Sequence, residues 1–285
     1  MKPQPFAYRR ATSLADACAM LDAHDGNARI LAGGQSLIPS LALRLSQPEL
    51  LIDISQLADL RGIRIAGQEM VIGALTRHAD IERAADVKRL FPTLAEAARH
   101  IAHPAIRNRG TIGGSIALAD PAAEWPAAAL AFDMRFTTVS SKGERRLPAT
   151  DFFKGLYETA LEPGEVLKSI HVPLPGANLR AAFGELTRRS GDYAIVGAFV
   201  NATVTGGRLS VPRVAYFGVA SRALLATGAM HALDGSSSGD AAALDAARAC
   251  LEADLDPIAD LYNGRATKLH LSGVLLGRLL ARLVA

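Results

Sequence analysis

Two short glycine-containing segments carry the residue types that can bind a phosphate group. The first is Ala32-Gly33-Gly34-Gln35-Ser36, and the second is Thr111-Ile112-Gly113-Gly114-Ser115. Paired glycines let backbone N–H groups converge on an anion without obstruction by a Cβ atom, and the N-terminus of a following helix adds partial positive charge. The amide and hydroxyl side chains in both segments add further donors. Together the two loops could clasp one diphosphate.

Each loop taken alone also has a simpler interpretation, a tight turn between a strand and a helix. Neither has the Gly-x-x-x-x-Gly-Lys-Ser/Thr pattern of P-loop ATPases or the Gly-x-Gly-x-x-Gly pattern of Rossmann dinucleotide sites. Ser36 and Ser115 lack the Gly-x-Ser-x-Gly context of a hydrolase nucleophile. The sequence motifs that would support a P-loop ATPase, a Rossmann dinucleotide site or a serine hydrolase are therefore missing from these loops.

The segments around the first loop predict the elements that hold it. An apolar run at 28–32 predicts a strand before the loop, and 37–45, with Pro39 in its first turn, predicts a helix after it. A helix over 13–24 precedes this strand. Short strands are predicted next, over 50–54, 63–66 and 69–73.

A second unit is predicted from about residue 76, and a third after the Val-Pro-Leu-Pro-Gly run at 172–176. The second unit has predicted helices over 79–85, 92–101 and through 125–131, a polar linking stretch over 103–109, and strands over 135–140, 145–148, 156–160 and 166–172. The third has strands over 181–188, 195–205 and 211–219, a hairpin turn at Gly206-Gly207, and helices over 221–233, 239–254 and 267–284. Strands followed by helices predict an α+β domain. The expected division is 1–176, with subdomains of about 1–75 and 76–176, and then 177–285.

Composition and charge exclude several classes of protein. The chain has 285 residues, of which 49% are hydrophobic and 21% charged, as in ordinary globular proteins. The 31 Lys and Arg against 28 Asp and Glu are scattered, which argues against nucleic acid binding. Two cysteines, Cys18 and Cys250, are too few for an iron–sulfur cluster, a disulfide framework or a cysteine-based zinc site. No signal peptide or apolar run long enough for a membrane span is evident, so we expect a soluble cytoplasmic protein.

Three longer segments, in this order, resemble a known flavoprotein family. They are LAGGQSLIP at 31–39, RNRGTIGGSIALADPAAEWP at 107–126 and RRSGDYAIVG at 188–197. The sequence resembles the FAD-binding medium subunit of molybdenum hydroxylases, the family of carbon monoxide dehydrogenase and xanthine dehydrogenase flavoproteins. The resemblance covers nearly the whole chain. It implies a vanillyl-alcohol oxidase/PCMH-like FAD-binding fold of two α+β subdomains, plus a C-terminal α+β domain with an antiparallel sheet and helices.

The resemblance also implies which residues contact FAD. The two glycine loops would hold the pyrophosphate, Glu124 would hydrogen-bond the flavin nucleotide, and Leu167 would line the cofactor site. Ile101 would lie near the adenine end, and Tyr193 next to the isoalloxazine ring. The complete predicted set is Ala32, Gly33, Gly34, Gln35, Ser36, Leu37, Ile101, Thr111, Ile112, Gly113, Gly114, Ser115, Glu124, Leu167 and Tyr193. No catalytic residue and no metal ligand is predicted.

Several of these residues have ordinary interpretations as well. Leu167 and Ile101 are typical core residues, Tyr193 fits the edge of a strand, and Glu124 fits the start of a helix. His100 and His103 form an H-x-x-H pair at the end of a predicted helix. With no nearby carboxylate or third ligand, we expect this pair to be solvated and not to bind a metal.

The function implied by the resemblance is that of an electron-transfer subunit. It would take electrons from iron–sulfur clusters on a small partner subunit and pass them to an external acceptor, while a large subunit carries molybdopterin. The implied assembly is a heterotrimer that dimerises. A stand-alone FAD-dependent oxidoreductase and a non-catalytic assembly factor are the alternatives. One departure from the family lies at Gly184 and Glu185, where many relatives carry a nearby lysine.

Overall fold

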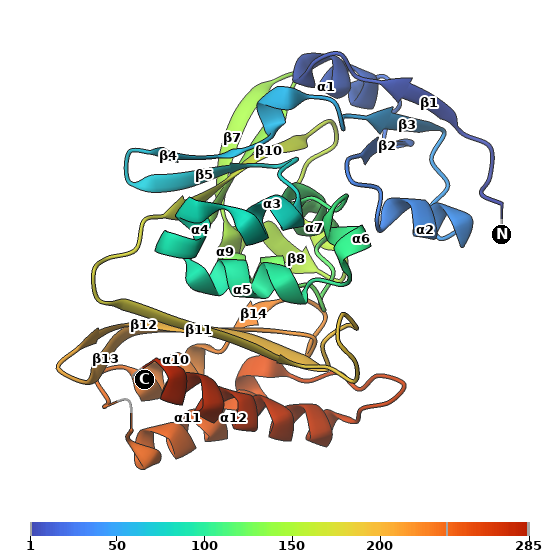
Figure 1. Cartoon of the computed structure of the whole chain (residues 1–285). Helices are drawn as coiled ribbons and strands as arrows, with labels where there is room; N and C mark the ends of the chain where they lie inside the picture. Colours follow the sequence, from blue (N-terminus) through green and yellow to red (C-terminus); the bar gives the residue numbers. More distant parts are fainter. Residues whose placement is uncertain (1, 238, 284–285) are drawn as a thin grey trace.

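Three main sheets, each with its own helices, follow one another along the described part of the chain, besides one two-stranded sheet (Figure 1). The structure is a computed structural model that describes residues 2–237 and 239–283. The N-terminal sheet has the order β1-β3-β2 and is parallel. Its elements are β1 (Ala7–Arg10), α1 (Leu14–Asp22), β2 (Ala28–Leu31), α2 (Leu37–Ala42) and β3 (Leu50–Asp53). The first glycine loop therefore joins β2 to α2, as the sequence predicts.

The second sheet is antiparallel, with the order β4-β5-β10-β6-β7. Its strands are β4 (Ile63–Ala66), β5 (Glu69–Gly73), β6 (Arg135–Ser140), β7 (Gly143–Pro148) and β10 (Val166–Pro173). Side chains alternate between the two faces of a strand, so Ile72, Phe136 and Ile170 share one face and join the largest hydrophobic cluster. A short 3₁₀ helix at Ala58–Leu60 precedes β4, and β8 (Phe153–Gly155) pairs with β9 (Glu158–Thr159).

Seven helices belong to this second unit, in the part of the chain that is described. They are α3 (His78–Arg83), α4 (Ala85–Leu90), α5 (Pro92–His100), α6 (Pro104–Arg107), α7 (Ile112–Leu118), α8 (Glu124–Ala131) and α9 (Ala149–Phe152). Because β4 and β5 share a sheet with β10, this sheet runs across the expected subdomain division at residues 75 and 76. Pairing between distant strands produces this arrangement, and no local pattern encodes it.

The C-terminal sheet has the order β11-β12-β13-β14 and is antiparallel. Its elements are β11 (Leu179–Leu186), β12 (Val196–Thr205), β13 (Arg208–Phe217), β14 (Leu224–Leu225), α10 (Thr227–Leu233), α11 (Ala241–Leu255) and α12 (Arg265–Arg282). In Figure 1 the three helices cover one face of this sheet and the second unit lies against the other. Phe183, Phe199 and Phe217 accordingly belong to the cluster shared with the second unit, whereas Val200 and Tyr216 pack towards the helices.

Two side chains of the C-terminal domain cap the C-terminal end of α8. The guanidinium of Arg213 donates two hydrogen bonds, of 3.0 and 2.6 Å, to the carbonyl oxygen of Leu130, and the Asn201 amide donates one of 2.7 Å to the carbonyl of Ala131. These groups satisfy carbonyls that the last turn of a helix leaves without an intrahelical donor. The helix whose first residue is Glu124 is therefore fixed at its far end by the other domain.

Some predicted elements differ from the structure for local physical reasons. The stretch over 103–109, predicted as a polar link, contains α6, which begins at Pro104, a position where proline is favourable. The helix predicted over 79–85 ends at Arg83, because Ala84 adopts a non-helical conformation between α3 and α4. The helix predicted over 221–233 is wrong in its first half, where Leu224–Leu225 pairs with β13. The last helix ends at Arg282, and the predicted end at Val284 lies outside the described residues.

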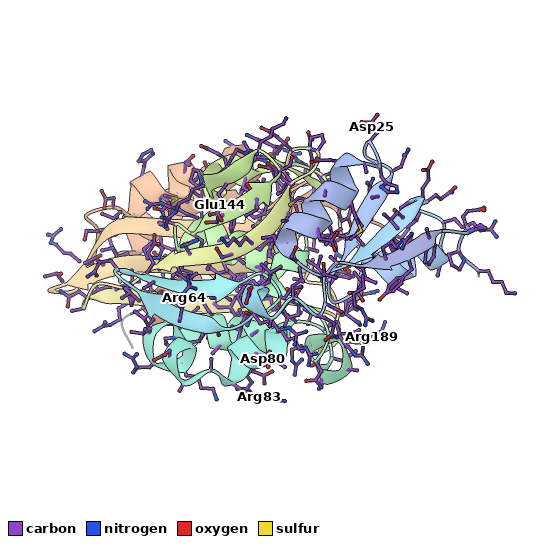
Figure 2. The ribbon with its side chains drawn as sticks, turned by 90° about the horizontal axis from the view of Figure 1, so that it is seen from above. Asp25, Arg64, Asp80, Arg83, Glu144 and Arg189 are labelled. Atoms are coloured by element: carbon purple, nitrogen blue, oxygen red, sulfur yellow. The ribbon has the colours of Figure 1, made fainter. Side chains whose placement is uncertain are left out.

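Charged side chains are spread over the surface and not gathered in one basic stripe. Figure 2 labels six exposed examples: Asp80 and Arg83 share α3, and the others lie on other elements or loops, namely Asp25, Arg64, Glu144 and Arg189. Within residues 2–237 and 239–283, no helix combines the length and the apolar character that crossing a membrane requires.

Candidate functional site

The first glycine loop is pressed against the beginning of the second. A Cβ atom added to Gly33 would fall 2.4 Å from the carbonyl oxygen of Arg109 and 2.8 Å from Cα of Gly110. Gly34 has a φ of +72°, a conformation that favours glycine. One glycine therefore allows a close approach between two segments distant in the chain, and the other allows the turn. The two predicted loops do lie together.

The backbone of the first loop has donors to spare. In the described part of the chain, no group accepts a hydrogen bond from the backbone N–H of Gly33, Gly34, Gln35 or Ser36. The Gln35 side chain instead donates to the carbonyl of Gly33 at 2.9 Å, which stabilises the turn. Four successive N–H groups without protein partners can meet the oxygens of an anion.

The second loop is arranged differently. The N–H of Ile112 donates to the carbonyl of Thr76 at 3.0 Å, and that of Gly113 to the carbonyl of Ala74 at 2.9 Å. The N–H of Gly114 donates to Oγ1 of Thr111, the N-cap of α7, at 3.2 Å. These three donors already have protein partners, so the loop offers a ligand mainly the exposed surface of Gly114 and the half-buried side chain of Ser115.

Close packing fixes the second loop in place. A Cβ atom on Gly113 would lie 2.5 Å from Cβ of Ala74, and one on Gly110 would lie 2.9 Å from the imidazole of His78. Gly110 and His78 were not among the predicted site residues. The Gly110-Thr111 sequence resembles an ordinary turn, and only its contact with a buried imidazole shows that it positions the loop.

A group of acidic side chains lies where α8 begins. Glu124 is the first residue of that helix, and its burial, with the nearby charges of Glu185 and Asp120, raises the pKa of its carboxyl group to about 8. Asp120 accepts hydrogen bonds from the N–H of Ala122 at 2.9 Å and from the hydroxyl of Tyr157 at 3.5 Å. Burial raises the pKa of Asp120 as well. At neutral pH Glu124 is therefore a neutral acid that can donate a hydrogen bond.

Tyr193 reaches this group from the loop that follows β11. Its residue is 67% exposed, yet burial of the hydroxyl end and the neighbouring Asp120 raise its pKa to about 12. The ring face is therefore open while the hydroxyl remains protonated beside a carboxyl group. This arrangement suits a ring that packs against a flat ligand.

Ile101 and Leu167 both lie in the hydrophobic core. Each is less than a tenth exposed, and both belong to the cluster that includes Trp125. The carbonyl of Ile101, at the end of α5, accepts a hydrogen bond of 3.1 Å from Arg107. Packing alone accounts for these two side chains, and their contact with FAD stays a prediction.

Both histidines of the H-x-x-H pair are exposed, as expected, but the premise that no carboxylate lies nearby is wrong. Nδ1 of His100 lies 3.1 Å from Oε1 of Glu185, so a carboxylate from the C-terminal domain is nearby after all. His103 packs against Gly191, where an added Cβ atom would come within 2.6 Å of the imidazole. The pair forms part of the contact between domains. Over residues 2–237 and 239–283, no group of three or more His, Cys, Asp or Glu side chains could hold a metal ion.

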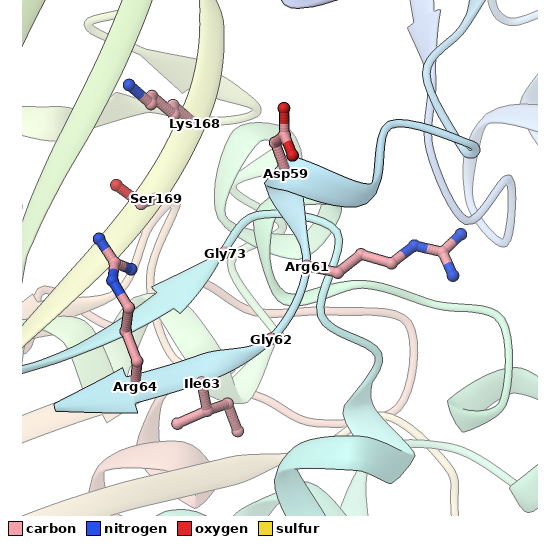
Figure 3. A pocket seen from close by; sticks show the side chains of 8 residues that line it. All are labelled: Asp59, Arg61, Gly62, Ile63, Arg64, Gly73, Lys168 and Ser169. Atoms are coloured by element: carbon pink, nitrogen blue, oxygen red, sulfur yellow. The ribbon is translucent and has the colours of Figure 1, made fainter.

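A separate pocket lies on the second sheet, where its lining includes Lys168, the residue after Leu167. It has a volume of about 180 Å³ and is lined by Asp59, Arg61, Gly62, Ile63, Arg64, Gly73, Lys168 and Ser169. Figure 3 shows Arg64 and Ser169 on the same side of the pocket, whereas Arg61 extends away from it. Lys168 is already paired with Glu144. None of the fifteen predicted FAD residues lines this pocket.

Comparison with known proteins identifies the family. Residues 4–175 match the family described as the FAD binding domain in molybdopterin dehydrogenase, and residues 181–283 match the C-terminal domain of the CO dehydrogenase flavoprotein. The sequence is 40% identical to the 6-hydroxypseudooxynicotine dehydrogenase complex subunit alpha of Paenarthrobacter nicotinovorans, over 99% of this chain and 95% of that protein. It is 39% identical to the carbon monoxide dehydrogenase medium chain of Hydrogenophaga pseudoflava, over 98% and 97%.

Solved structures agree with these sequence matches. Carbon monoxide dehydrogenase from Hydrogenophaga pseudoflava gives a TM-score of 0.96 at 40% identity, covering 100% of this chain and 99% of that chain. Quinoline 2-oxidoreductase from Pseudomonas putida 86 gives 0.93 at 37% identity, covering 99% and 98%. The predicted FAD cofactor and α+β flavoprotein fold are confirmed. The chain belongs to the family of FAD-binding medium subunits of the molybdenum hydroxylases, and is thus an oxidoreductase subunit.

Proposed function

We propose that this chain is the FAD-carrying electron-transfer subunit of a molybdenum-containing hydroxylase or dehydrogenase. It takes electrons from iron–sulfur clusters on a partner subunit and delivers them to an external acceptor. The observation that carries the proposal is the cradle formed where Gly33 meets Arg109 and Gly110, with four backbone donors of the first loop without protein partners.

The residues present fit FAD. A diphosphate needs several fixed donors, and the N–H groups over 33–36 supply them beside the exposed Gly114 and the Ser115 hydroxyl. Glu124, protonated at neutral pH, donates a hydrogen bond to the nucleotide, and the open ring face of Tyr193 packs on the isoalloxazine. Bound FAD supplies the chemistry of accepting and releasing electrons, whereas the protein contributes placement and electrostatics. In this proposal residues 1–176 hold the cofactor and 177–285 cover its ring.

Separate partner chains follow from what this chain can carry. Two cysteines cannot ligate an iron–sulfur relay, so the clusters and the molybdenum centre reside on a small and a large subunit respectively. Leu156 and Tyr157 are each more than half exposed, and Tyr157 lies beside Asp120. Exposed apolar side chains at this position fit a contact with a partner. The assembly is a cytoplasmic heterotrimer that dimerises.

Purification from the native source tests the proposal. Size-exclusion chromatography of native extract, followed by mass spectrometry of the co-eluting chains, should find this chain with a smaller cysteine-rich subunit and a larger one. The chain alone should bind FAD, be reduced by dithionite and be reoxidised by an artificial acceptor. It should hydroxylate no carbon monoxide, purine, aldehyde or aromatic heterocycle. A native species that contains this chain alone and turns over an organic substrate would instead establish a stand-alone oxidoreductase, and a chain without flavin an assembly factor.

A further inference from the structure

One buried carboxylate at the junction between the domains has only half of its hydrogen-bonding capacity used. Glu185 lies on β11, and its side chain is 4% exposed. Oε1 is paired with Nδ1 of His100 at 3.1 Å. Oε2 has no hydrogen-bond partner among the described residues. A buried, incompletely paired carboxylate is costly to maintain and its charge is poorly screened, so its field acts strongly on its surroundings.

The surroundings of Glu185 are the candidate flavin residues. Its partner His100 directly precedes Ile101 at the end of α5, and Tyr193 follows in the loop after β11. The charge of Glu185 also contributes to the raised pKa of Glu124, the residue proposed to hydrogen-bond the flavin nucleotide. The loop that carries Tyr193 packs on the same end of α5, since an added Cβ atom on Gly191 would lie 2.6 Å from His103 and 2.8 Å from the carbonyl oxygen of Ala102. Glu185 and that loop therefore both face the end of α5 from the C-terminal domain.

The charges that face His100 determine how much of this negative charge is offset. From its own helix these are Glu96 and Arg99, which act in opposite directions, and across the junction there is Glu185. The ring of Phe183 lies edge-on to the imidazole, with centroids 5.2 Å apart, and 46% of the His100 side chain is exposed to solvent. His100 thus holds the carboxylate in place and, when protonated, balances part of its charge.

We propose that Glu185 is a further electrostatic residue of the flavin site, whose fixed negative charge opposes reduction of the flavin, with His100 as its positioning partner. The proposal rests on the function proposed above. Reduction adds negative charge to the flavin ring system, and a nearby anion disfavours the more negative form. A lowered reduction potential favours onward transfer of electrons to the external acceptor.

The test compares two substitutions in the FAD-loaded full-length chain, one that removes a negative charge and one that removes a positive charge. Glu185→Gln removes the negative charge but keeps the size, and His100→Gln removes the positive charge but keeps an N–H donor for Glu185. Midpoint potentials are measured against a reference dye at about pH 6, where His100 is charged, because its pairing with Glu185 raises its pKa. Glu185→Gln should raise the ratio of reduced to oxidised flavin at a given potential about tenfold, which is about 30 mV for a two-electron couple. His100→Gln should lower it.

Glu252→Gln is the control. Glu252 is an exposed carboxylate on α11, one of the helices that cover the opposite face of the C-terminal sheet, and its loss should leave the potential unchanged. If Glu185 only holds the domains together, Glu185→Gln and His100→Gln will shift the potential in the same direction or not at all. Either result overturns the inference. Fluorescence titration of the unmodified chain with FAD comes first. Failure to bind FAD there overturns the proposed function itself, whereas binding with unchanged potentials overturns only the role of Glu185.

Discussion

Nε1–H of Trp125 donates a hydrogen bond of 3.0 Å to Nδ1 of His78 inside the core. The bond joins the start of α8 to the start of α3, and both side chains are at most 5% exposed. The same imidazole lies against Gly110, at the entry to the second glycine loop. A neutral histidine that accepts from an indole thus supports both the loop and the helix that carries Glu124.

The stability of the protein should therefore depend on the protonation of His78. Burial lowers its pKa from 6.5 to about 4, so between these values the unfolded chain binds more protons than the folded one. The contribution is fully present above about pH 6.5 and is lost as the pH falls towards 4, by roughly 3 kcal/mol in total. Chemical unfolding at a series of pH values should show a steeper loss for the natural chain than for His78→Gln. Equal slopes for the two chains would contradict the assignment.

Glu124 should have the opposite pH dependence in the protein without FAD. Its folded pKa of about 8 exceeds the ordinary 4.5, so the folded state holds a proton that the unfolded chain releases. Stability should fall as the pH rises from about 4.5 to 8, by roughly 1.4 kcal/mol for each unit of the pKa difference. Glu124→Gln should remove this loss and be more stable than the natural chain at about pH 8.5.

The control for this prediction is Glu162→Gln. It removes a carboxylate whose side chain is 61% exposed, so its effect on unfolding should not grow with pH. A Glu124→Gln chain that is no more stable than the natural one at alkaline pH would show that Glu124 is already solvated.

Gly34→Ala should weaken FAD binding at least about tenfold, because a Cβ atom at φ +72° strains the turn and would contact Leu31 and Ile38 at 3.3 Å. Gly67→Ala is the matched control, with φ +61° and open space around the added atom. Both variants should lose about 1 kcal/mol of stability, and only the first should lose affinity in a fluorescence titration. Equal affinities in both variants would mean that the first loop does not hold the cofactor.

Substitutions at the two glycines of the second loop should affect different properties, one the stability of the fold and the other FAD binding. Gly113→Val places new atoms against Ala74, 2.5 Å from the ideal Cβ position, and should destabilise the fold by about 3 kcal/mol or more. Gly114→Val places them on the exposed surface, 3.0 Å from Oγ1 of Thr111 at the ideal Cβ position, and should abolish FAD binding at a much smaller cost in stability. Unaltered FAD affinity in folded Gly114→Val would defeat the assignment of this loop.

FAD should be bound without a covalent link. Neither glycine loop contains a cysteine or histidine, and Cys18 is buried against the carbonyl of Val139. Acid precipitation of the purified protein should release all flavin absorbance into the supernatant. Flavin retained on the precipitated chain would disprove the prediction.

Local sequence determined the turns, most strands and the identity of the loops. Gly33-Gly34 after an apolar strand, Pro39 in a first helical turn and Gly206-Gly207 between two strands each act within a few residues, so their conformations could be predicted without tertiary structure. The three longer segments of the family resemblance likewise predict FAD and the fold from the sequence alone.

Tertiary structure decided which backbone N–H groups of the glycine loops have protein partners, and which residues distant in the sequence are in contact. The glycine loops look alike in sequence, yet the N–H groups of Ile112 and Gly113 are taken by Thr76 and Ala74, because β5 ends beside α7. Strand β14 formed where a helix was predicted, because pairing with β13 outweighed local propensity. Glu185 and His100 are 85 residues apart and meet only when the C-terminal sheet packs on α5. Contacts of this kind depend on the packing of whole domains, which no short segment of sequence encodes.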